Sequence, residues 1–162
     1  MSDFDPTRAE RHEQLDDETI TRWSRFATGD TTIFPVHLGF VIEDLRQDYC
    51  RMRLPNRTEM LQGAGIMHGG AIAALLDGVL VPAVGATLPR GARYSTVDLH
   101  VQFIRAVPGP RPDGTGGEDA VAEGWVVRRG RTTAFCESEV FAADSGRLVA
   151  KSVSTYNISL PG

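Results

Sequence analysis

The sequence predicts an α+β protein in which an antiparallel sheet wraps around one long, buried helix. Three observations support this fold class. Residues 69–88 are the most apolar part of the chain and lack a polar face, as expected of a helix that is covered on all sides. Two short strand-like runs precede this helix, and several longer ones follow it. Polar or glycine-containing turns separate consecutive runs, so successive strands are expected to pair antiparallel.

Length and composition fit a single globular domain. The chain has 162 residues, of which 41% are hydrophobic and 23% are charged, close to the averages for soluble globular proteins. The formal net charge of −4 argues against general nucleic-acid binding. The acidic N-terminus lacks the basic start and apolar centre of a signal peptide, so a cytoplasmic location is expected.

Residues 1–34 are predicted to form an acidic N-terminal extension with one short helix. Residues 1–18 hold seven acids and two arginines, a run that is expected to be solvated and partly frayed. Residues 16–28 are predicted as a helix, because three acidic residues suit its start and Gly29 suits its end. Its apolar stripe, which is expected to pack on the body as a flap, consists of Ile20, Trp23 and Phe26.

The main domain is predicted to span residues 35–160, after a proline that breaks the chain, and to begin with a hairpin. Residues 37–45 and 49–54 have strand-like composition, and residues 46–48 suit the turn between them. Residues 56–67 are expected to form a glycine-containing loop that leads to the helix.

The apolar segment of residues 69–88 is predicted to be a buried helix rather than a membrane span. Asp77 lies near its middle, where a carboxylate would cost about 2.5–3.5 kcal/mol on membrane-insertion scales. Pro82 cannot donate a hydrogen bond to the carbonyl of Gly78, so the helix should kink or end early there. Because one curved sheet cannot cover such a helix on all sides, a second copy of the chain is expected to complete its burial.

The second half of the chain is predicted to consist of strands. Residues 93–106 alternate, with Val97, Leu99, Val101 and Phe103 expected on one face and Thr96, Asp98, His100 and Gln102 on the other. A surface loop rich in proline and glycine follows at residues 107–119. Three further strands are expected, at residues 120–129, 132–143 and 147–158.

Two features of the helical segment are candidates for chemistry. Asp77 is the only ionisable residue between His68 and Arg90, so it is either a structural carboxylate with hydrogen-bonding partners or a general base or nucleophile. Gly69 and Gly70 follow His68 at the predicted helix start, where free N–H groups and the helix dipole favour an oxyanion. In the structural alternative, the glycines only make a tight entry to the helix and His68 only orients the loop.

Motifs for several other chemistries are missing from the sequence. It contains no GxSxG, HExxH or P-loop pattern, which removes the support for a serine hydrolase, a zinc protease or a P-loop nucleotidase. The four histidines do not have the spacing of metal ligands, so no metal site is predicted.

Three motifs in this order resemble those of the hot-dog acyl-CoA thioesterases found in phenylacetate degradation and in the human thioesterase superfamily. The first runs from Gln62 to Asp77 and has the family pattern of Asn or Gln, then His-Gly-Gly, then an acid nine residues after the histidine. The second is STVDLHVQFIR at residues 95–105, and the third joins residues 126–134 to residues 146–150. Together they extend over most of the main domain.

The resemblance implies a role for each matching residue. Asp77 would be the catalytic acid, acting as a base on water or as the nucleophile, and the Gly69 N–H would polarise the thioester carbonyl. Gln62 would hold the water or the carbonyl, and Thr96 would assist the acid. His68 belongs to the same catalytic motif. The residues implied in binding the substrate or its CoA are Gly70, Asp98, Arg128, Arg129, Gly130, Arg131 and Thr132.

The resemblance also implies a hot-dog fold and the hydrolysis of an acyl-CoA, with a medium-chain or aryl acyl group, to free acid and CoA. No cofactor is implied, because CoA is part of the substrate. The expected partner is a second copy of the chain, in a homodimer or homotetramer with the site at a subunit interface; neither nucleic acid nor a membrane is expected. Two alternatives stay open: a hot-dog acyl-thioester hydratase or dehydratase, and a non-catalytic acyl-CoA-binding protein.

Overall fold

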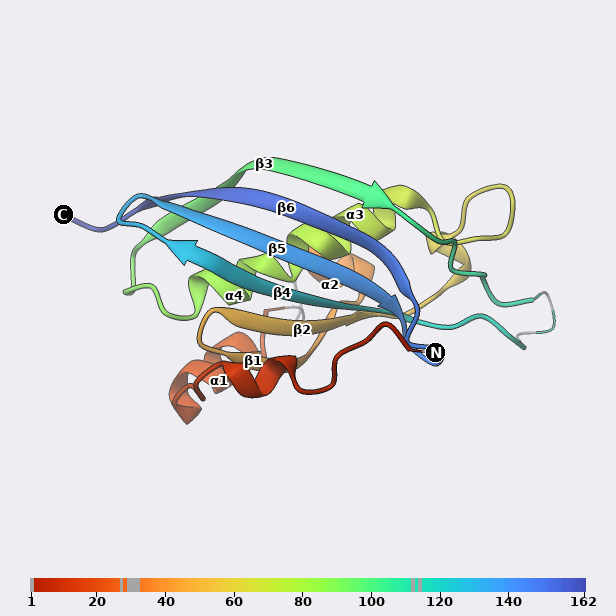
Figure 1. The fold of residues 1–162 in the computed structure, drawn as a ribbon, viewed down its shortest axis with the longest axis horizontal. Coiled ribbons are helices and arrows are strands. Elements are labelled where there is room, and N and C mark those ends of the chain that lie inside the picture. The colour runs from red at the N-terminus through yellow and green to blue at the C-terminus, as the bar shows by residue number, and fades with distance from the viewer. Residues whose placement is uncertain (1, 27, 29–32, 112, 114) are drawn as a thin grey trace.

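One antiparallel sheet of six strands curls around two consecutive helices, in agreement with the predicted α+β, hot-dog architecture (Figure 1). The computed structural model describes residues 2–26, 28, 33–111, 113 and 115–162. The strands are β1 (Val41–Arg46), β2 (Tyr49–Leu54), β3 (Arg93–Phe103), β4 (Ala120–Arg129), β5 (Thr133–Ala142) and β6 (Leu148–Ser159). Their order across the sheet is β1-β2-β4-β5-β6-β3, so β1 and β3 are the edge strands.

The apolar segment forms two helices, α3 (Gly69–Gly78) and α4 (Leu80–Gly85). The interruption at Val79 precedes Pro82, which has no N–H to donate to the carbonyl of Gly78. The early end that the sequence predicts is therefore confirmed. Within the described residues, no helix is both long and apolar enough to cross a membrane.

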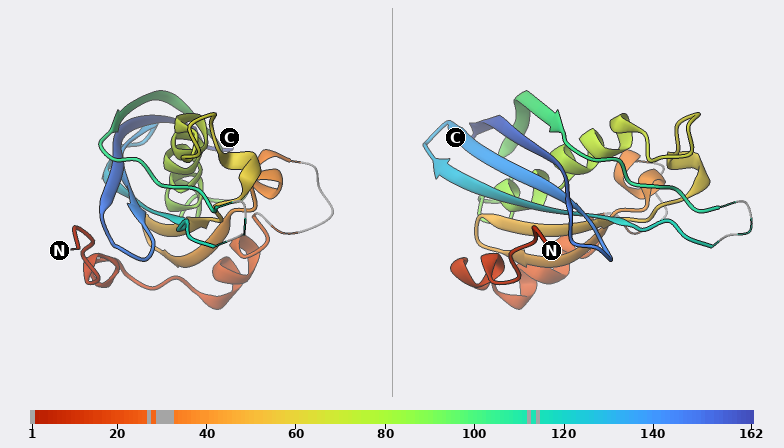
Figure 2. Two further views of the ribbon diagram at one scale, coloured as in Figure 1. Left: turned by 90° about the vertical axis from the view of Figure 1, so that its right-hand side faces the viewer. Right: turned by 45° about the vertical axis from the view of Figure 1, so that its right-hand side comes forward.

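The concave face of the sheet packs against both helices in one apolar core, and Figure 2 shows the helices end-on inside the curve. Leu75, Leu76 and Leu80 are fully buried in this core. Removing each such side chain from water stabilises the fold by about 1.5–3 kcal/mol. The helices lie close to β4 at Gly124, where a Cβ atom would be 2.8 Å from Val79. This packing fixes α3 relative to the strands that flank the candidate site.

The strand bounds follow the local sequence signals closely in most of the sheet. The bounds of β2 and β4 are those predicted, and the ends of β5 and β6 differ by one residue. The tight turn between β1 and β2 contains Asp48, whose φ of 58° lies in the left-handed region that aspartate tolerates. The predicted hairpin is therefore present, although its first strand starts later.

Residues before that hairpin form a short helix, α2 (Phe34–Leu38), so the prediction of a strand from residue 37 is wrong up to residue 40. Pro35 lies in the first turn of α2, where its fixed φ and missing N–H favour a helix start. Gly39 ends the helix with a left-handed φ of 74°. Pro35 thus begins a helix instead of only breaking the chain.

A β-bulge at Val97 changes the predicted alternation of β3. Thr96 and Asp98 pair with consecutive residues of β6, so Val97 between them has no partner of its own. Thr96 therefore shares the inner side of the sheet with Leu99, while Val97 is 67% exposed. The prediction that placed Val97 with Leu99 and Thr96 on the opposite face is wrong, because an extra residue shifts the alternation by one.

Residues 2–14, called the N-terminal segment below, lie along the outer, convex face of the sheet (Figure 2). Phe4 packs edge-on against Phe141, with ring centroids 5.3 Å apart. His12 stacks on Tyr49 with a centroid distance of 5.0 Å. The expectation of a frayed segment is therefore wrong for these residues, which are held by aromatic contacts that the net charge does not reveal.

Arg8 anchors the middle of the N-terminal segment to buried polar side chains. Its guanidinium lies 2.7 Å from Glu139, 3.1 Å from Glu123 and 4.2 Å from the ring centre of Trp125. The side chain of Glu123 is 1% exposed and accepts a hydrogen bond from the hydroxyl of Tyr49 at 2.6 Å. Burial raises the pKa of Glu123, although the Tyr49 hydrogen bond and the Arg8 charge oppose this shift.

The predicted helix of residues 16–28 is shorter in the structure, where α1 (Asp17–Trp23) is followed by turn residues. The predicted end at Gly29 lies outside the described residues. Trp23 contacts the end of α4, because a Cβ atom on Gly85 would be 2.8 Å from its ring. The helix therefore packs on the body near the C-terminal end of α4.

Candidate active site

The loop before α3 is held by backbone hydrogen bonds that fix where the helix begins. The N–H of His68 donates to the carbonyl of Met60 at 2.7 Å, and that of Met67 donates to Val107 at 2.8 Å. His68 caps the helix, because its Nδ1 accepts a hydrogen bond from the N–H of Gly70 at 2.8 Å. A neutral imidazole that accepts at Nδ1 carries its proton on Nε2. His68 therefore orients the start of α3.

The N–H of Gly69 remains available as a donor at this helix start. No described residue accepts a hydrogen bond from it, whereas the N–H of Gly70 is taken by His68. First-turn N–H groups lie at the positive end of the helix dipole and favour an anion. A Cβ atom on Gly70 would lie 2.9 Å from Nδ1 of His68, so glycine is needed there for the cap. Gly69 thus offers a free N–H donor, whereas Gly70 donates its N–H to the cap formed by His68.

Gln62 lies in the turn that leads to α3, beside an open hollow of about 310 Å³. Its Oε1 accepts a hydrogen bond from the N–H of Ala64 at 2.9 Å, which leaves the side-chain NH₂ group as a donor. Gln62 and Gly69, the first residue of α3, both line this hollow. The apolar side chains in its lining include Ile66, Met67, Ile72, Phe103 and Ile104.

Asp77 lies half-buried in the last turn of α3 and faces β3 and β6. Its Oδ1 accepts a hydrogen bond from the hydroxyl of Thr96 at 2.7 Å. The hydroxyl of Tyr156 lies 3.4 Å from the same oxygen and 3.3 Å from the backbone carbonyl of Asp77. Oδ2 receives no hydrogen bond from the part of the chain that the structure describes. Asp77 and Thr96 are therefore in contact, and the bulge at Val97 is what turns Thr96 inward.

Tyr156 is a neighbour of Asp77 that the sequence analysis misses. It lies on β6 directly opposite Thr96 and is 1% exposed. Burial and the charge of Asp77 raise the pKa of Tyr156, while the Thr96 hydroxyl lowers it in part, so the phenol stays protonated and can donate. The available signal was its position in the inward-facing alternation of the last strand, because a buried tyrosine hydroxyl usually requires a partner.

The predicted catalytic residues form two groups at the two ends of α3. Gln62, His68 and Gly69 surround its start, and Asp77 and Thr96 lie at its end. The eight residues that separate Gly69 from Asp77 correspond to about 12 Å along the axis at 1.5 Å per residue. One chain therefore does not bring the free N–H of Gly69 and the carboxylate of Asp77 to the same carbonyl group.

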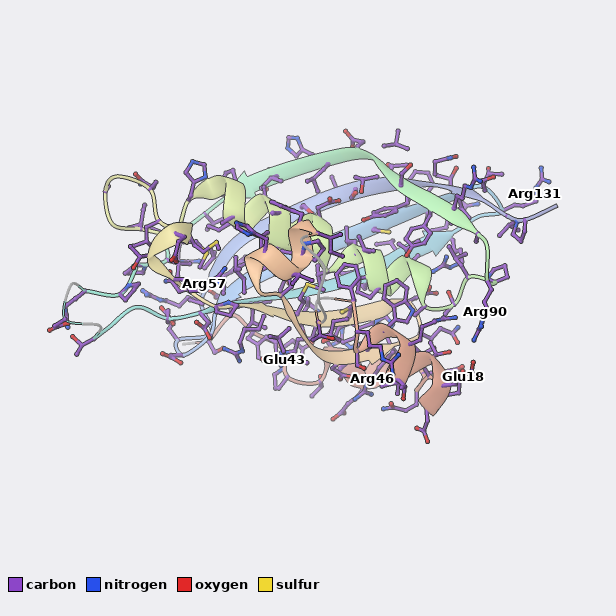
Figure 3. All side chains as sticks on the ribbon, turned by 180° about the vertical axis from the view of Figure 1, so that it is seen from behind. Glu18, Glu43, Arg46, Arg57, Arg90 and Arg131 are labelled. Carbon is purple, nitrogen blue, oxygen red and sulfur yellow. The ribbon has the colours of Figure 1, made fainter. Side chains whose placement is uncertain are left out.

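The turn between β4 and β5 lies beyond α4, at the far end of the sheet from the start of α3 (Figures 1 and 3). Arg131 extends from this end in Figure 3, and Arg128 and Thr132 are also exposed. The N–H of Gly130 donates to the carbonyl of Thr133 at 2.7 Å and closes the turn. The structure thus keeps these predicted CoA-binding residues apart from the Gly69 group of the same chain, whereas Ala134, just after the turn, pairs with Tyr156 beside Asp77.

Arg129 differs from the other arginines of this turn because it is tied to the body. Its guanidinium donates to Oδ1 of Asp48 in the β1–β2 turn and to the carbonyl of Val84 in α4, the latter at 3.1 Å. It therefore holds the β4–β5 turn in place. Asp98, the remaining predicted binding residue, is exposed on β3 beside the bulge.

Comparisons with known proteins match the part of the chain that holds most of these residues. A family model described as the thioesterase superfamily matches residues 64–149, which leaves out Gln62 and Tyr156. A candidate esterase from Halobacterium salinarum is 32% identical over 108 residues, covering 64% of this chain and 66%, just under two thirds, of that protein. Human acyl-coenzyme A thioesterase 13 is 28% identical over 109 residues, covering 67% of this chain and 71% of the relative.

The fold is also similar to solved structures. A phenylacetic acid degradation-related protein from Ralstonia eutropha is 27% identical, with a TM-score of 0.68. The similarity covers 83% of this chain and 98% of that one. The similarity therefore extends well beyond the segment that the family model matches.

Proposed function

Because this chain belongs to the thioesterase superfamily, we propose that it hydrolyses an acyl-CoA to the free acid and CoA. The observation that carries the proposal is the carboxylate of Asp77. Thr96 holds its Oδ1 at 2.7 Å, while Oδ2 has no hydrogen-bond partner among the described residues. A half-buried carboxylate with one oxygen left over is suited to activate a water molecule or to attack a carbonyl.

The carboxylate has two routes to the same products. In the first, Asp77 takes a proton from water as the water oxygen bonds to the thioester carbon, and it returns the proton to the CoA thiolate when the C–S bond breaks. In the second, Asp77 itself attacks the carbonyl, CoA leaves, and water hydrolyses the mixed anhydride. Both routes need the ionised carboxylate and regenerate it.

We propose that the N–H of Gly69 donates a hydrogen bond to the carbonyl oxygen of the thioester. Negative charge develops on this oxygen in both routes, and loss of one preorganised donor typically costs about 2.7–4 kcal/mol of transition-state stabilisation. Gly69 is favoured over Gly70 because His68 already accepts the Gly70 N–H at 2.8 Å. The side-chain NH₂ group of Gln62, beside the same hollow, is the second proposed donor to the carbonyl or to the attacking water.

The complete site is proposed to combine two copies of the chain. Gly69 and Asp77 are about 12 Å apart along α3, which is too far for both to act on one carbonyl group. A second copy can supply the missing partner if its helix start lies beside Asp77. The protein is therefore proposed to be a homodimer, or a homotetramer made of such dimers.

Edge strand β3 is the proposed dimer interface. It is 11 residues long, and Val97 and Phe103 are 67% and 56% exposed. Antiparallel pairing of two copies about a twofold axis between Leu99 and His100 sets Thr96 opposite Phe103 of the partner subunit. The ring of Phe103 lies 3.4 Å from the position of a Cβ atom on Gly69. Such pairing would bring the Asp77 group of one copy to the Gly69 group of the other.

The two ends of the substrate are proposed to bind in chemically different places. The hollow of about 310 Å³ with mostly apolar lining suits a medium-chain or aryl acyl group. Exposed Arg128 and Arg131 suit the phosphates of CoA, which arginine binds with paired hydrogen bonds. Gly130 and Thr132 are proposed to contact the pantetheine arm. No cofactor is proposed, because CoA is itself part of the substrate.

The proposal is tested by measuring CoA release from short-, medium- and long-chain and aryl acyl-CoAs. We expect wild type to turn over at least one class and Asp77→Asn to lose at least a hundredfold in kcat, about 2.7 kcal/mol of barrier. Asp144→Asn makes the same chemical change at an exposed position and should keep full activity.

Two outcomes would contradict hydrolysis. Tight binding of acyl-CoA without any CoA release would identify a binding protein. Addition of water to an enoyl-CoA without release of CoA would identify a hydratase. That chemistry pairs an acid with a histidine, whereas the described side chains that hydrogen-bond to the Asp77 carboxylate are the hydroxyls of Thr96 and Tyr156.

A further inference from the structure

We propose that Tyr156 is a positioning residue for the reaction: from β6 it holds the Oδ1 side of Asp77, so that Oδ2 is the oxygen that reacts. The inference rests on the proposed hydrolysis. It is carried by the place of Tyr156 at the end of α3 and by its contacts with Asp77.

The early end of α3 explains why a hydroxyl from the sheet is found at this point. A helix that stops leaves its last carbonyls without the N–H groups of a following turn. The hydroxyl of Ser138 donates to the carbonyl of Leu76 at 3.0 Å, and the hydroxyl of Tyr156 lies 3.3 Å from the carbonyl of Asp77. Hydroxyl groups from the inner face of the sheet therefore approach the last carbonyls of α3. Tyr156 does so at Asp77, the residue that carries the reactive carboxylate.

The phenol hydroxyl of Tyr156 is directed at two oxygens of Asp77, and the Thr96 hydroxyl lies close enough to lower the pKa of Tyr156 in part. Both contacts are long, at 3.3 Å to the carbonyl and 3.4 Å to Oδ1. The side chain is 1% exposed, so solvent water does not compete for the proton. Because a buried donor without an acceptor is costly, the proton is shared between these two oxygens of Asp77.

Thr96 and Tyr156 together restrict how the carboxylate can turn. They are opposite each other on β3 and β6, and both approach Oδ1 of Asp77. A carboxylate held by two donors on one oxygen keeps the other oxygen in a fixed direction. That oxygen, Oδ2, is the one without a partner in the described part of the chain.

Two other titratable groups near Tyr156, Tyr94 and Cys136, are neutral near pH 7. Burial raises the pKa of Tyr94 and the pKa of Cys136, each to about 12. Asp77 is therefore the charged group that faces the phenol. Removing the phenol hydroxyl leaves the carboxylate with one donor fewer, which favours its protonated form and lets it turn.

The test compares Tyr156→Phe with Tyr94→Phe. Tyr94 is the control, because it is a partly buried tyrosine of the neighbouring strand β3 whose hydroxyl lies against Gly85 instead of Asp77. We expect Tyr156→Phe to lower kcat about tenfold, the effect of one hydrogen bond to a charged group. Its KM for acyl-CoA should change less than about twofold, because a buried side chain does not touch the substrate. The acid limb of its pH–rate profile should move to higher pH, and Tyr94→Phe should match wild type in all three measurements.

A second measurement does not depend on turnover. The carboxyl carbon of Asp77, assigned by comparison with Asp77→Asn, is titrated by ¹³C NMR in wild type and in Tyr156→Phe. A midpoint at higher pH in Tyr156→Phe supports the proposed contact. An unchanged midpoint, or unchanged kcat and pH profile in an active enzyme, overturns it. If wild type releases CoA from no acyl-CoA, the proposed hydrolysis fails, and the titration still decides whether Tyr156 holds Asp77.

Discussion

Replacing Arg8 with methionine should lower the free energy of unfolding by about 3 kcal/mol, because removing one partner of a buried ion pair typically costs about 3–5 kcal/mol. Glu123, 1% exposed, would stay buried beside Glu139 without its cation. The lower end of the range applies for two reasons. Arg8 Nη1 is 3.1 Å from Glu123 but is not aligned for a hydrogen bond, and Tyr49 still donates to Glu123 at 2.6 Å. Methionine keeps an apolar stem over Trp125, so little packing is lost.

The loss is measured by urea unfolding, followed by circular dichroism at pH 7, for four proteins: wild type, Arg8→Met, Glu123→Gln and the double variant. The double variant should recover most of the loss, because a neutral amide needs no cation and can still accept from Tyr49. Arg11→Met is the control, since its 2.6 Å ion pair with Asp5 is exposed and should be worth less than about 1 kcal/mol. The reasoning is refuted if Arg8→Met is as stable as wild type, or if the double variant is no more stable than Arg8→Met.

Two further predictions concern pH and assembly. Burial raises the pKa of Glu123 above its ordinary value of 4.5. Between pH 4.5 and the raised pKa, the folded protein therefore binds more protons than the unfolded chain, and its stability falls as the pH rises through this window. A urea series across this range should give a flatter dependence for Glu123→Gln, and equal slopes would contradict the assignment. Val97→Arg places a charge on the exposed edge of β3 and should yield monomers with at least a tenfold lower kcat/KM, because Gly69 and Asp77 would no longer meet. Light scattering and CoA release test this, and a fully active dimer would rule out the β3 interface.

Local signals in the sequence were sufficient for the central part of the fold. Pro82 predicts the interruption of the apolar helix because the missing N–H acts within one turn. The bounds of β2 and β4 follow from composition and from the turns beside them. The bulge at Val97 could not be predicted in this way, because it depends on the register between β3 and β6. The strict alternation predicted from the sequence therefore places Thr96 on the outer face, whereas in the structure it lies on the inner face and contacts Asp77.

The family resemblance predicted the pairing of Asp77 with Thr96, which the strand alternation did not. It grouped Asp77 with Thr96 from motif order alone, and the two side chains are 2.7 Å apart. It did not include Tyr156, whose contribution depends on where α3 ends and on which residue of β6 faces Thr96. The charge pattern failed at the N-terminal segment for a similar reason. One arginine and two aromatic rings, Phe4 and His12, decide its place on the sheet, whereas the count of acids describes only its solvent-facing side.

Two irregularities of the backbone meet at Asp77, and each has a consequence for the site. The interruption after Gly78 places Asp77 in the last turn of α3, within reach of hydroxyls from the sheet. The bulge turns Thr96 inward and leaves Val97 on the exposed edge. The sheet has register shifts in other strand pairs too, but the one at Val97 is set apart because it brings Thr96 into contact with Asp77. In a regular β3 strand Thr96 would face away from α3, and Asp77 would keep only the long contact from Tyr156. The bulge is therefore best understood as part of the proposed site.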